Sequence, residues 1–296
     1  MKGALTRLNP YIVVIYYVLV MVLGILVKHP LHLAVLFLCG IVVAVMVAGL
    51  RVTARTIGYG LIMSALIVLI NPLVSKEGVT RIVEWGEFYI TLESVVYGAV
   101  SALMLMTVFV WFVSWNVIMT GDKYIYTLGR VLPSVSLLIS LILRLIPELE
   151  REYNDIKTSI YSMRLYDVSR LRGRFSLSVH ALRVLIAHSI ETSALRADSM
   201  EARGYGIAHR SCYLGYKWRV GDTIFITLTL LLGGMAIAGH VLHHSYASFY
   251  PIINVDMSGT YTFVSFAVIA LYGLVPVLFE TKEAIAWKVY LSHISR

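Results

Sequence analysis

Charged side chains are scarce in this sequence. Asp, Glu, Lys and Arg together make up 14% of its 296 residues, whereas hydrophobic types make up 58%. So few polar residues cannot cover a water-soluble core that holds so many apolar side chains. The composition therefore excludes an ordinary soluble domain and predicts an integral membrane protein.

Cysteine is also rare, and the motifs of several enzyme classes are missing. Cys39 lies in an apolar run and Cys212 in a basic region, so we expect different depths and no disulfide between them. The sequence has no phosphate-binding loop ending in Gly-Lys-Ser/Thr, no Asp-rich pair for magnesium, no Gly-x-Ser-x-Gly elbow and no His-Glu-x-x-His zinc helix. These absences argue against nucleotide hydrolysis and against an enzyme.

Six apolar runs approach the length that crosses a bilayer, which is about 20 residues of helix. Helices are expected because lipid offers no hydrogen-bond partner, so every backbone N–H and C=O group inside the bilayer must be paired within the protein. The runs cover roughly residues 11–27, 31–50, 57–74, 94–119, 222–242 and 261–279. We predict an all-α polytopic membrane protein with about six transmembrane helices. Residues 1–121 would hold spans one to four, 122–219 a region of two long cytoplasmic helices, and 220–296 spans five and six.

The distribution of positive charge predicts the orientation. With the N-terminus in the cytoplasm, only Lys28, Lys76 and Arg81 among the Lys and Arg residues fall outside. Cytoplasmic loops of membrane proteins carry such an excess of Lys and Arg. Both termini and residues 122–219 are therefore expected in the cytoplasm.

A hairpin is expected between the third and fourth apolar runs. Apolar and polar residues alternate on either side of Trp85-Gly86, between Arg81 and Ile90. Glu93 then opens the fourth run. Its carboxylate suits the first turn of a helix, where the helix dipole favours negative charge. A charge buried in the membrane would instead mark a functional site.

The first long cytoplasmic helix is predicted from Ser134 to about Arg164, with Ser134 as its N-cap and Pro147 as a kink. Its apolar part, residues 135–146, is too short to cross a membrane. This part suits the membrane interface or a protein partner.

The second long helix is predicted from His180 to Arg203, and Gly204 supplies a left-handed stop. The basic segment 166–178 before it is interpreted as a connection near anionic lipid headgroups. No aromatic platform accompanies its arginines, so nucleic acid is not an expected partner. The helix carries an apolar stripe at helical spacing, at positions 182, 185, 186, 189, 190, 193, 194, 197 and 200.

Three histidines close the fifth apolar run. His240, His243 and His244 are spaced so that all three could face one direction, which permits a metal ligand set. Histidines at a membrane interface are more common, and Asp256 is the only carboxylate in the following loop. We therefore predict no metal site.

Several motifs together resemble a known family, the T component of energy-coupling factor (ECF) transporters, the EcfT/CbiQ-type transmembrane subunit. They are Arg196-Ala-Asp-Ser-Met-Glu-Ala-Arg-Gly-Tyr205, Ile90-Thr-Leu-Glu-Ser-Val-Val-Tyr-Gly98, Asn71-Pro-Leu followed by Gly78, and Met119-Thr-Gly-Asp-Lys123 leading to Arg144-Leu-Ile-Pro147. The resemblance covers residues 70 to 206 and is weaker in the spans on either side.

The resemblance implies an energy-coupling subunit in the plasma membrane of a prokaryote. It would transmit the motion of two cytoplasmic ABC ATPases, identical or different, to a separate substrate-binding membrane S component. The cargo would be a vitamin or a transition-metal ion, and specificity would belong to the S component. This chain would bind no cofactor directly, because ATP and Mg sit on the ATPases.

The resemblance also implies roles for individual residues. Arg203 would dock into an ATPase, with Glu201, Ala202 and Gly204 shaping the helix end around it. Arg164 would dock at the first helix end, where Ser162-Met163-Arg164-Leu165 lacks the alanine and glycine of the family motif. Leucine does not easily supply a left-handed stop there. The S component would contact a set of apolar residues, namely Leu138, Leu145, Leu182, Ile186 and Ile190.

Other functions compete with this one. A membrane enzyme acting on a lipid or isoprenoid phosphate would use Glu93, Asp122 and cytoplasmic arginines, and the purified chain alone would turn over substrate. A conventional ABC permease would bind substrate by itself. A structural scaffold would leave the basic helix ends without a task, and Arg203 would then only complement the helix dipole.

Overall fold

The structure is a computed structural model that describes residues 4–75, 78–85, 88–166, 169–205, 216, 218–242, 247–255 and 260–294. Its contacts divide the chain into two compact units. The first contains Met1–Tyr124 and Tyr216–Arg296, and the second contains Ile125–Gly215. Each unit is described by itself.

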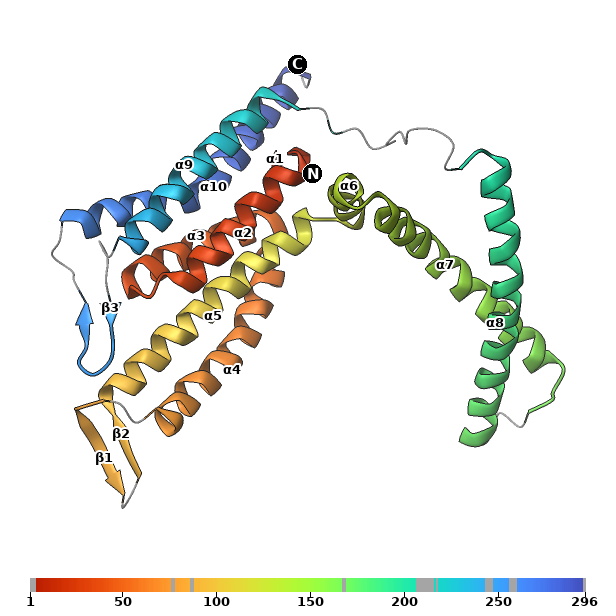
Figure 1. Cartoon of the computed structure of the whole chain (residues 1–296), viewed down its shortest axis with the longest axis horizontal. Helices are drawn as coiled ribbons and strands as arrows, with labels where there is room; N and C mark the ends of the chain where they lie inside the picture. Colours follow the sequence, from red (N-terminus) through yellow and green to blue (C-terminus); the bar gives the residue numbers. More distant parts are fainter. Residues whose placement is uncertain are drawn as a thin grey trace. The chain divides into compact units, whose positions relative to one another are not determined.

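The first unit is a bundle of helices with two small antiparallel hairpins (Figure 1). Its helices are α1 (Ala4–Arg7), α2 (Pro10–Leu26), α3 (Pro30–Ala48), α4 (Leu50–Val74), α5 (Leu92–Ile118), α9 (Val220–Val241) and α10 (Thr260–Ile294). Strand β1 (Arg81–Trp85) pairs with β2 (Phe88–Thr91), and β3 (Ala247–Ser248) pairs with β4 (Asn254–Val255).

Five helices among the described residues are long and apolar enough to cross a membrane: α3, α4, α5, α9 and residues 261–287 of α10. The all-α, polytopic prediction is confirmed. The sixth predicted span is α2, which is apolar but has only 17 residues. At about 1.5 Å per residue it is roughly 26 Å long, slightly less than a hydrocarbon core of about 30 Å.

Helix α2 packs its buried face against other helices of the bundle. Tyr16 packs its ring 5.4 Å from the ring centroid of Phe225 on α9 and 5.2 Å from that of Tyr272 on α10. The Tyr16 hydroxyl donates to the Tyr272 carbonyl, and the Tyr272 hydroxyl donates back to the Tyr16 carbonyl. Trp111 of α5 completes this aromatic core and donates from Nε1 to the Leu36 carbonyl of α3 at 3.1 Å. This aromatic core buries one face of α2, whereas Val18, Val22 and Ile25 stay exposed.

The predicted hairpin is confirmed, and it explains Glu93. Strands β1 and β2 lead into α5, whose N-cap is Thr91. The Glu93 side chain is buried in the first turn of α5 and accepts hydrogen bonds from the Thr80 backbone N–H at 3.0 Å and from the Thr80 hydroxyl at 2.5 Å. The carboxylate therefore fixes the hairpin to the helix start, as the capping interpretation predicts.

Gly78 is required by the same packing, which yields a test. A Cβ added at Gly78 would lie 2.5 Å from Thr91 Oγ1 and would press on the Glu93 carboxylate. We expect Gly78→Ala to lower the stability by about 1 to 3 kcal/mol through overpacking, measured as a lower Tm of the purified chain in detergent. The matched control is Gly239→Ala in α9, where nothing lies within 4 Å of the added Cβ. An equal Tm for the two variants would contradict the packing argument.

The second unit holds most of α6 (Gly121–Val131), together with α7 (Pro133–Ser162) and α8 (Leu171–Ala202). Helix α7 agrees with its prediction to within two residues at each end and is continuous through Pro147, but its N-cap is Leu132, and Ser134 lies inside the first turn. Helix α8 begins nine residues earlier than predicted, so the interpretation of 166–178 as a connection is wrong from Leu171 onward. The reason is that Leu177 and Ala181 are buried against Ile160 of α7, which extends the packed part of the helix.

Candidate functional site

Helices α7 and α8 pack against each other in opposite directions. Near the end of α7, Ile160 packs with Leu177 and Ala181 near the start of α8. Twelve positions earlier on α7, Glu148 forms an ion pair with Arg196 of α8, with 2.5 Å between Oε1 and Nη2. Residues further along α7 therefore contact residues nearer the start of α8, so the two helices cross as an antiparallel pair (Figure 1).

This arrangement places Arg164 and Arg203 at opposite ends of the pair. Arg203 lines the same cavity as Arg144 of α7, whereas Arg164 follows the far end of α7. The part of α7 between Arg144 and Arg164 extends over about 30 Å at about 1.5 Å per residue. The family resemblance named both arginines as candidate docking residues, but the sequence did not predict how far apart they lie.

The end of α8 is a left-handed cap of the Schellman type. Gly204 has φ +80°, its N–H donates to the Glu201 carbonyl at 2.8 Å, and the Tyr205 N–H donates to the Met200 carbonyl at 3.1 Å. Such a cap satisfies carbonyls that the helix end leaves open. Arg203 lies one position before the glycine, directly after Ala202, and its side chain is exposed. It forms no ion pair with any residue that the structure describes.

The end of α7 differs by one residue. Arg164 itself has φ +54°, and its N–H donates to the Tyr161 carbonyl at 3.0 Å. Arg164 therefore occupies the backbone position that Gly204 occupies in α8, and Met163 occupies the position of Arg203. The left-handed stop that Leu165 does not easily supply is formed by Arg164 itself. The two arginines match in the sequence motif but not in the geometry of the helix end.

The left-handed backbone conformation of Arg164 predicts a measurable effect on stability. This conformation costs a non-glycine residue about 1 to 2 kcal/mol. We expect Arg164→Gly to raise the free energy of unfolding of the purified chain by about 1 kcal/mol, measured as a higher Tm. Leu165→Gly is the matched control and should lower the Tm or leave it unchanged. A rise for Leu165→Gly alone would restore the original alignment of the motif.

The apolar residues predicted to contact an S component are mostly exposed. Leu138 of α7 is 57% exposed and Ile190 of α8 is 66% exposed, with Leu182 and Ile186 close to half. Leu145 is half-buried and lines the cavity near Arg203. Leu185 belongs to the same sequence stripe but is buried. The stripe is therefore divided between contact within the unit and a surface that is left for a partner or lipid.

The residues named for a phosphate-binding enzyme do not come together. Glu93 lies in the first turn of α5 and is already bound to Thr80. Asp122 lies in the first turn of α6, just beyond the other end of α5. The 27 residues of α5 separate them by about 40 Å, since a helix rises about 1.5 Å per residue. One phosphate cannot contact both.

The structure describes only part of the predicted histidine group. His240 lies in the last turn of α9, whereas His243, His244 and Asp256 fall outside the described residues, as does Cys212. Sequence reasoning missed another pair, His29 and His32 at the start of α3, whose ring centroids lie 4.5 Å apart. The Nε2 atom of His32 is 2.8 Å from the Ser265 hydroxyl of α10. Within the described part of the chain, no three His, Cys, Asp or Glu side chains form a group that could hold a metal ion.

Comparison with known proteins gives one match. The model of the protein family CbiQ, cobalt transport protein, matches residues 1–213. This range contains α1 to α8, and therefore both arginine-bearing helix ends. No curated protein matches the chain.

Proposed function

Because the chain belongs to the CbiQ family of cobalt transport proteins, we propose that it is the energy-coupling subunit of an ECF-type ABC importer. The family makes it a membrane component of a transport complex. In this proposal two cytoplasmic ABC ATPases bind ATP and Mg, and a separate S component binds a vitamin or a transition-metal ion. The chain itself catalyses no reaction and transmits motion between these partners.

The observation that carries the proposal is the crossed pair α7 and α8, with an exposed arginine at each far end. A separation of about 30 Å along α7 allows each arginine to contact a different subunit. Arginine presents a rigid fork of donors that binds a carboxylate with two hydrogen bonds. Arg203 forms no ion pair with any described residue, so its fork is available to a partner.

The exposed apolar residues of both helices suit the second task. Leu138, Leu182, Ile186 and Ile190 are exposed apolar side chains, and their burial needs an apolar surface on another molecule. Apolar contact is non-directional, so a partner can tilt or slide on them without losing fixed hydrogen bonds. We assign these side chains, together with Leu145, to contact with the S component.

The proposal places the chain in the plasma membrane of a prokaryote, with both termini and residues 122–219 in the cytoplasm. The excess of Lys and Arg in these segments supports that orientation. The ATPases would then meet α7 and α8 on the side where ATP is present.

Native purification tests the proposal. The affinity-purified chain should bring with it two ATPase subunits, of one kind or two, and one small membrane protein, each identified by mass spectrometry. Reconstituted uptake should require all of them together with ATP. Uptake or substrate turnover by the isolated chain would contradict the proposal and would favour a permease or an enzyme.

A further inference from the structure

A cavity lies between α7 and α8 beside the end of α8, and its walls differ in character. Its volume is about 500 Å³. Four apolar side chains line it: Leu141 and Leu145 from α7, and Ala197 and Met200 from α8. Three arginines and one glutamate line it as well, and they are Arg144, Arg196, Arg203 and Glu148. The cavity therefore combines an apolar wall with a group of cations.

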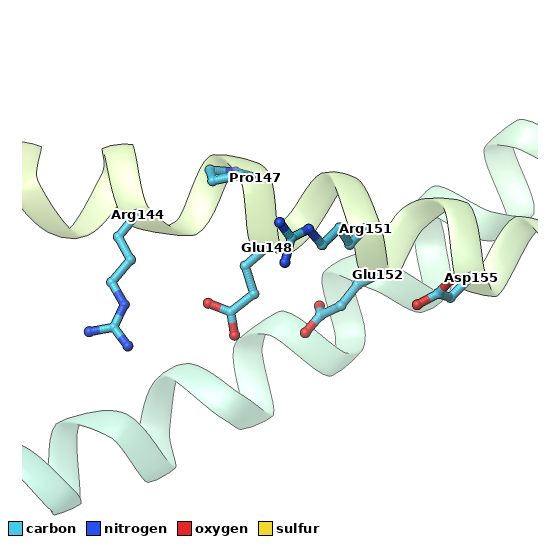
Figure 2. A pocket seen from close by; sticks show the side chains of 6 residues that line it. All are labelled: Arg144, Pro147, Glu148, Arg151, Glu152 and Asp155. Carbon is cyan, nitrogen blue, oxygen red and sulfur yellow. The ribbon is translucent and has the colours of Figure 1, made fainter.

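The positive charge of this cavity is not balanced. Glu148 is the only carboxylate among the lining residues, and it is bound to Arg196. Arg144 and Arg203 form no ion pair with any described residue. Figure 2 shows the side chains of Arg144 and Glu148 projecting from the same side of α7, where α8 passes. The Arg144 guanidinium is therefore available to an anion from outside the chain.

The next cavity along α7 provides a contrast. It has a volume of about 430 Å³ and is lined by Arg144, Pro147, Glu148, Arg151, Glu152 and Asp155 (Figure 2). Its three carboxylates outnumber its two arginines. An anion is therefore attracted to the cavity near Arg203 and not to the part of α7 around Arg151.

The apolar wall indicates what kind of anion fits. A free phosphate would leave Leu141 and Met200 in contact with water, whereas an amphiphile with an anionic head covers both parts of the cavity. The same stretch of α7 exposes further apolar side chains, namely Leu138, Ile142, Leu143 and Ile146. A helix with such a face and nearby arginines suits the interface of a membrane that contains anionic lipid.

We propose that this cavity binds an anionic phospholipid, with its phosphate on the Arg144 guanidinium and the start of its acyl chains on Leu141 and Met200. The volume lies within the range of about 300 to 1,000 Å³ that is typical of small-molecule sites. Glu148 contributes indirectly, because its ion pair holds Arg196 across the helix crossing. The inference rests on the packing of α7 and α8 and does not depend on ATPase docking.

The test uses the full-length chain in detergent with three probes: phosphatidylglycerol, phosphatidylcholine with the same acyl chains, and inorganic phosphate. Native mass spectrometry counts bound lipid, and the Tm reports stabilisation. Phosphatidylglycerol should bind and raise the Tm, and Arg144→Gln should weaken its binding about tenfold or more, since a charge-assisted contact is lost. Arg144→Lys should retain most of the binding. The matched control Arg151→Gln should behave as the wild type.

Three results would overturn the proposal. Undiminished phosphatidylglycerol binding by Arg144→Gln would remove the assigned cation. Equal binding of phosphatidylcholine would show that the site does not distinguish an anionic headgroup from a zwitterionic one. Full protection by inorganic phosphate would make the cavity a site for free anions and not for a lipid.

Discussion

Replacing Arg203 with glutamate is expected to release ATPase from the detergent-purified complex. Truncating one half of a buried interfacial charge pair costs about 2 to 5 kcal/mol, and a reversed charge adds repulsion from the carboxylate it faces. The new carboxylate would also stand at the negative end of the helix dipole of α8. We expect at least a tenfold loss of co-purified ATPase, measured as subunit stoichiometry by native mass spectrometry.

The control for this variant is Arg183→Glu, which reverses an exposed arginine on the same helix far from either helix end. It should leave the stoichiometry unchanged. If Arg203 only complements the helix dipole, Arg203→Glu would shift stability by about 0.3 to 1 kcal/mol and keep both ATPases. Wild-type stoichiometry in Arg203→Glu would therefore exclude the docking role.

Replacing Ile190 with glutamate is expected to detach the S component while the ATPases remain. Ile190 is 66% exposed in the isolated chain, so a glutamate there is well solvated and the fold should persist. Against an apolar partner the same carboxylate loses its water and finds no counter-ion, which costs several kcal/mol. Uptake should fall to background, and the small membrane subunit should be absent from the purified complex.

Leu195→Glu is a closely matched control for Ile190→Glu. Leu195 is 64% exposed on the same helix, but five residues further along, which turns it well away from Ile190 around the helix axis. We expect Leu195→Glu to keep the S component. Equal loss in both variants would show that the effect is a general loss of helix packing and not a loss of one contact surface.

The sequence predicted those parts of the fold that depend on local pattern. Apolar length predicted the spans, and the Trp85-Gly86 alternation predicted the hairpin. The helical spacing and Gly204 predicted α7 and the end of α8. The start of α8 was predicted too late, because Arg172, Gly173 and Arg174 in its first turns have a composition that resembles a loop. Its packing on Ile160 is a tertiary contact that no local pattern contains.

The sequence suggested residues for the candidate site but not their geometry, and their docking role stays a prediction. The resemblance suggested both Arg203, in its Ala-Arg-Gly motif, and Arg164. Residue type gave no reason to place Arg164 at positive φ, since arginine rarely adopts that conformation. The Glu148–Arg196 ion pair and the arginine-lined cavity join residues about 50 positions apart, so they depend on how α7 and α8 cross. The resemblance contained neither.

Site-specific cross-linking tests the central claim most directly. A photo-reactive residue at position 203 and, in a second variant, at position 164 would be illuminated in intact cells, and the products identified by mass spectrometry. The account predicts that each position forms an adduct with an ATPase subunit, and that the two positions together can label both ATPases of one complex. Adducts with neither ATPase, or labelling of both positions by a membrane-impermeant reagent from outside the cell, would contradict it.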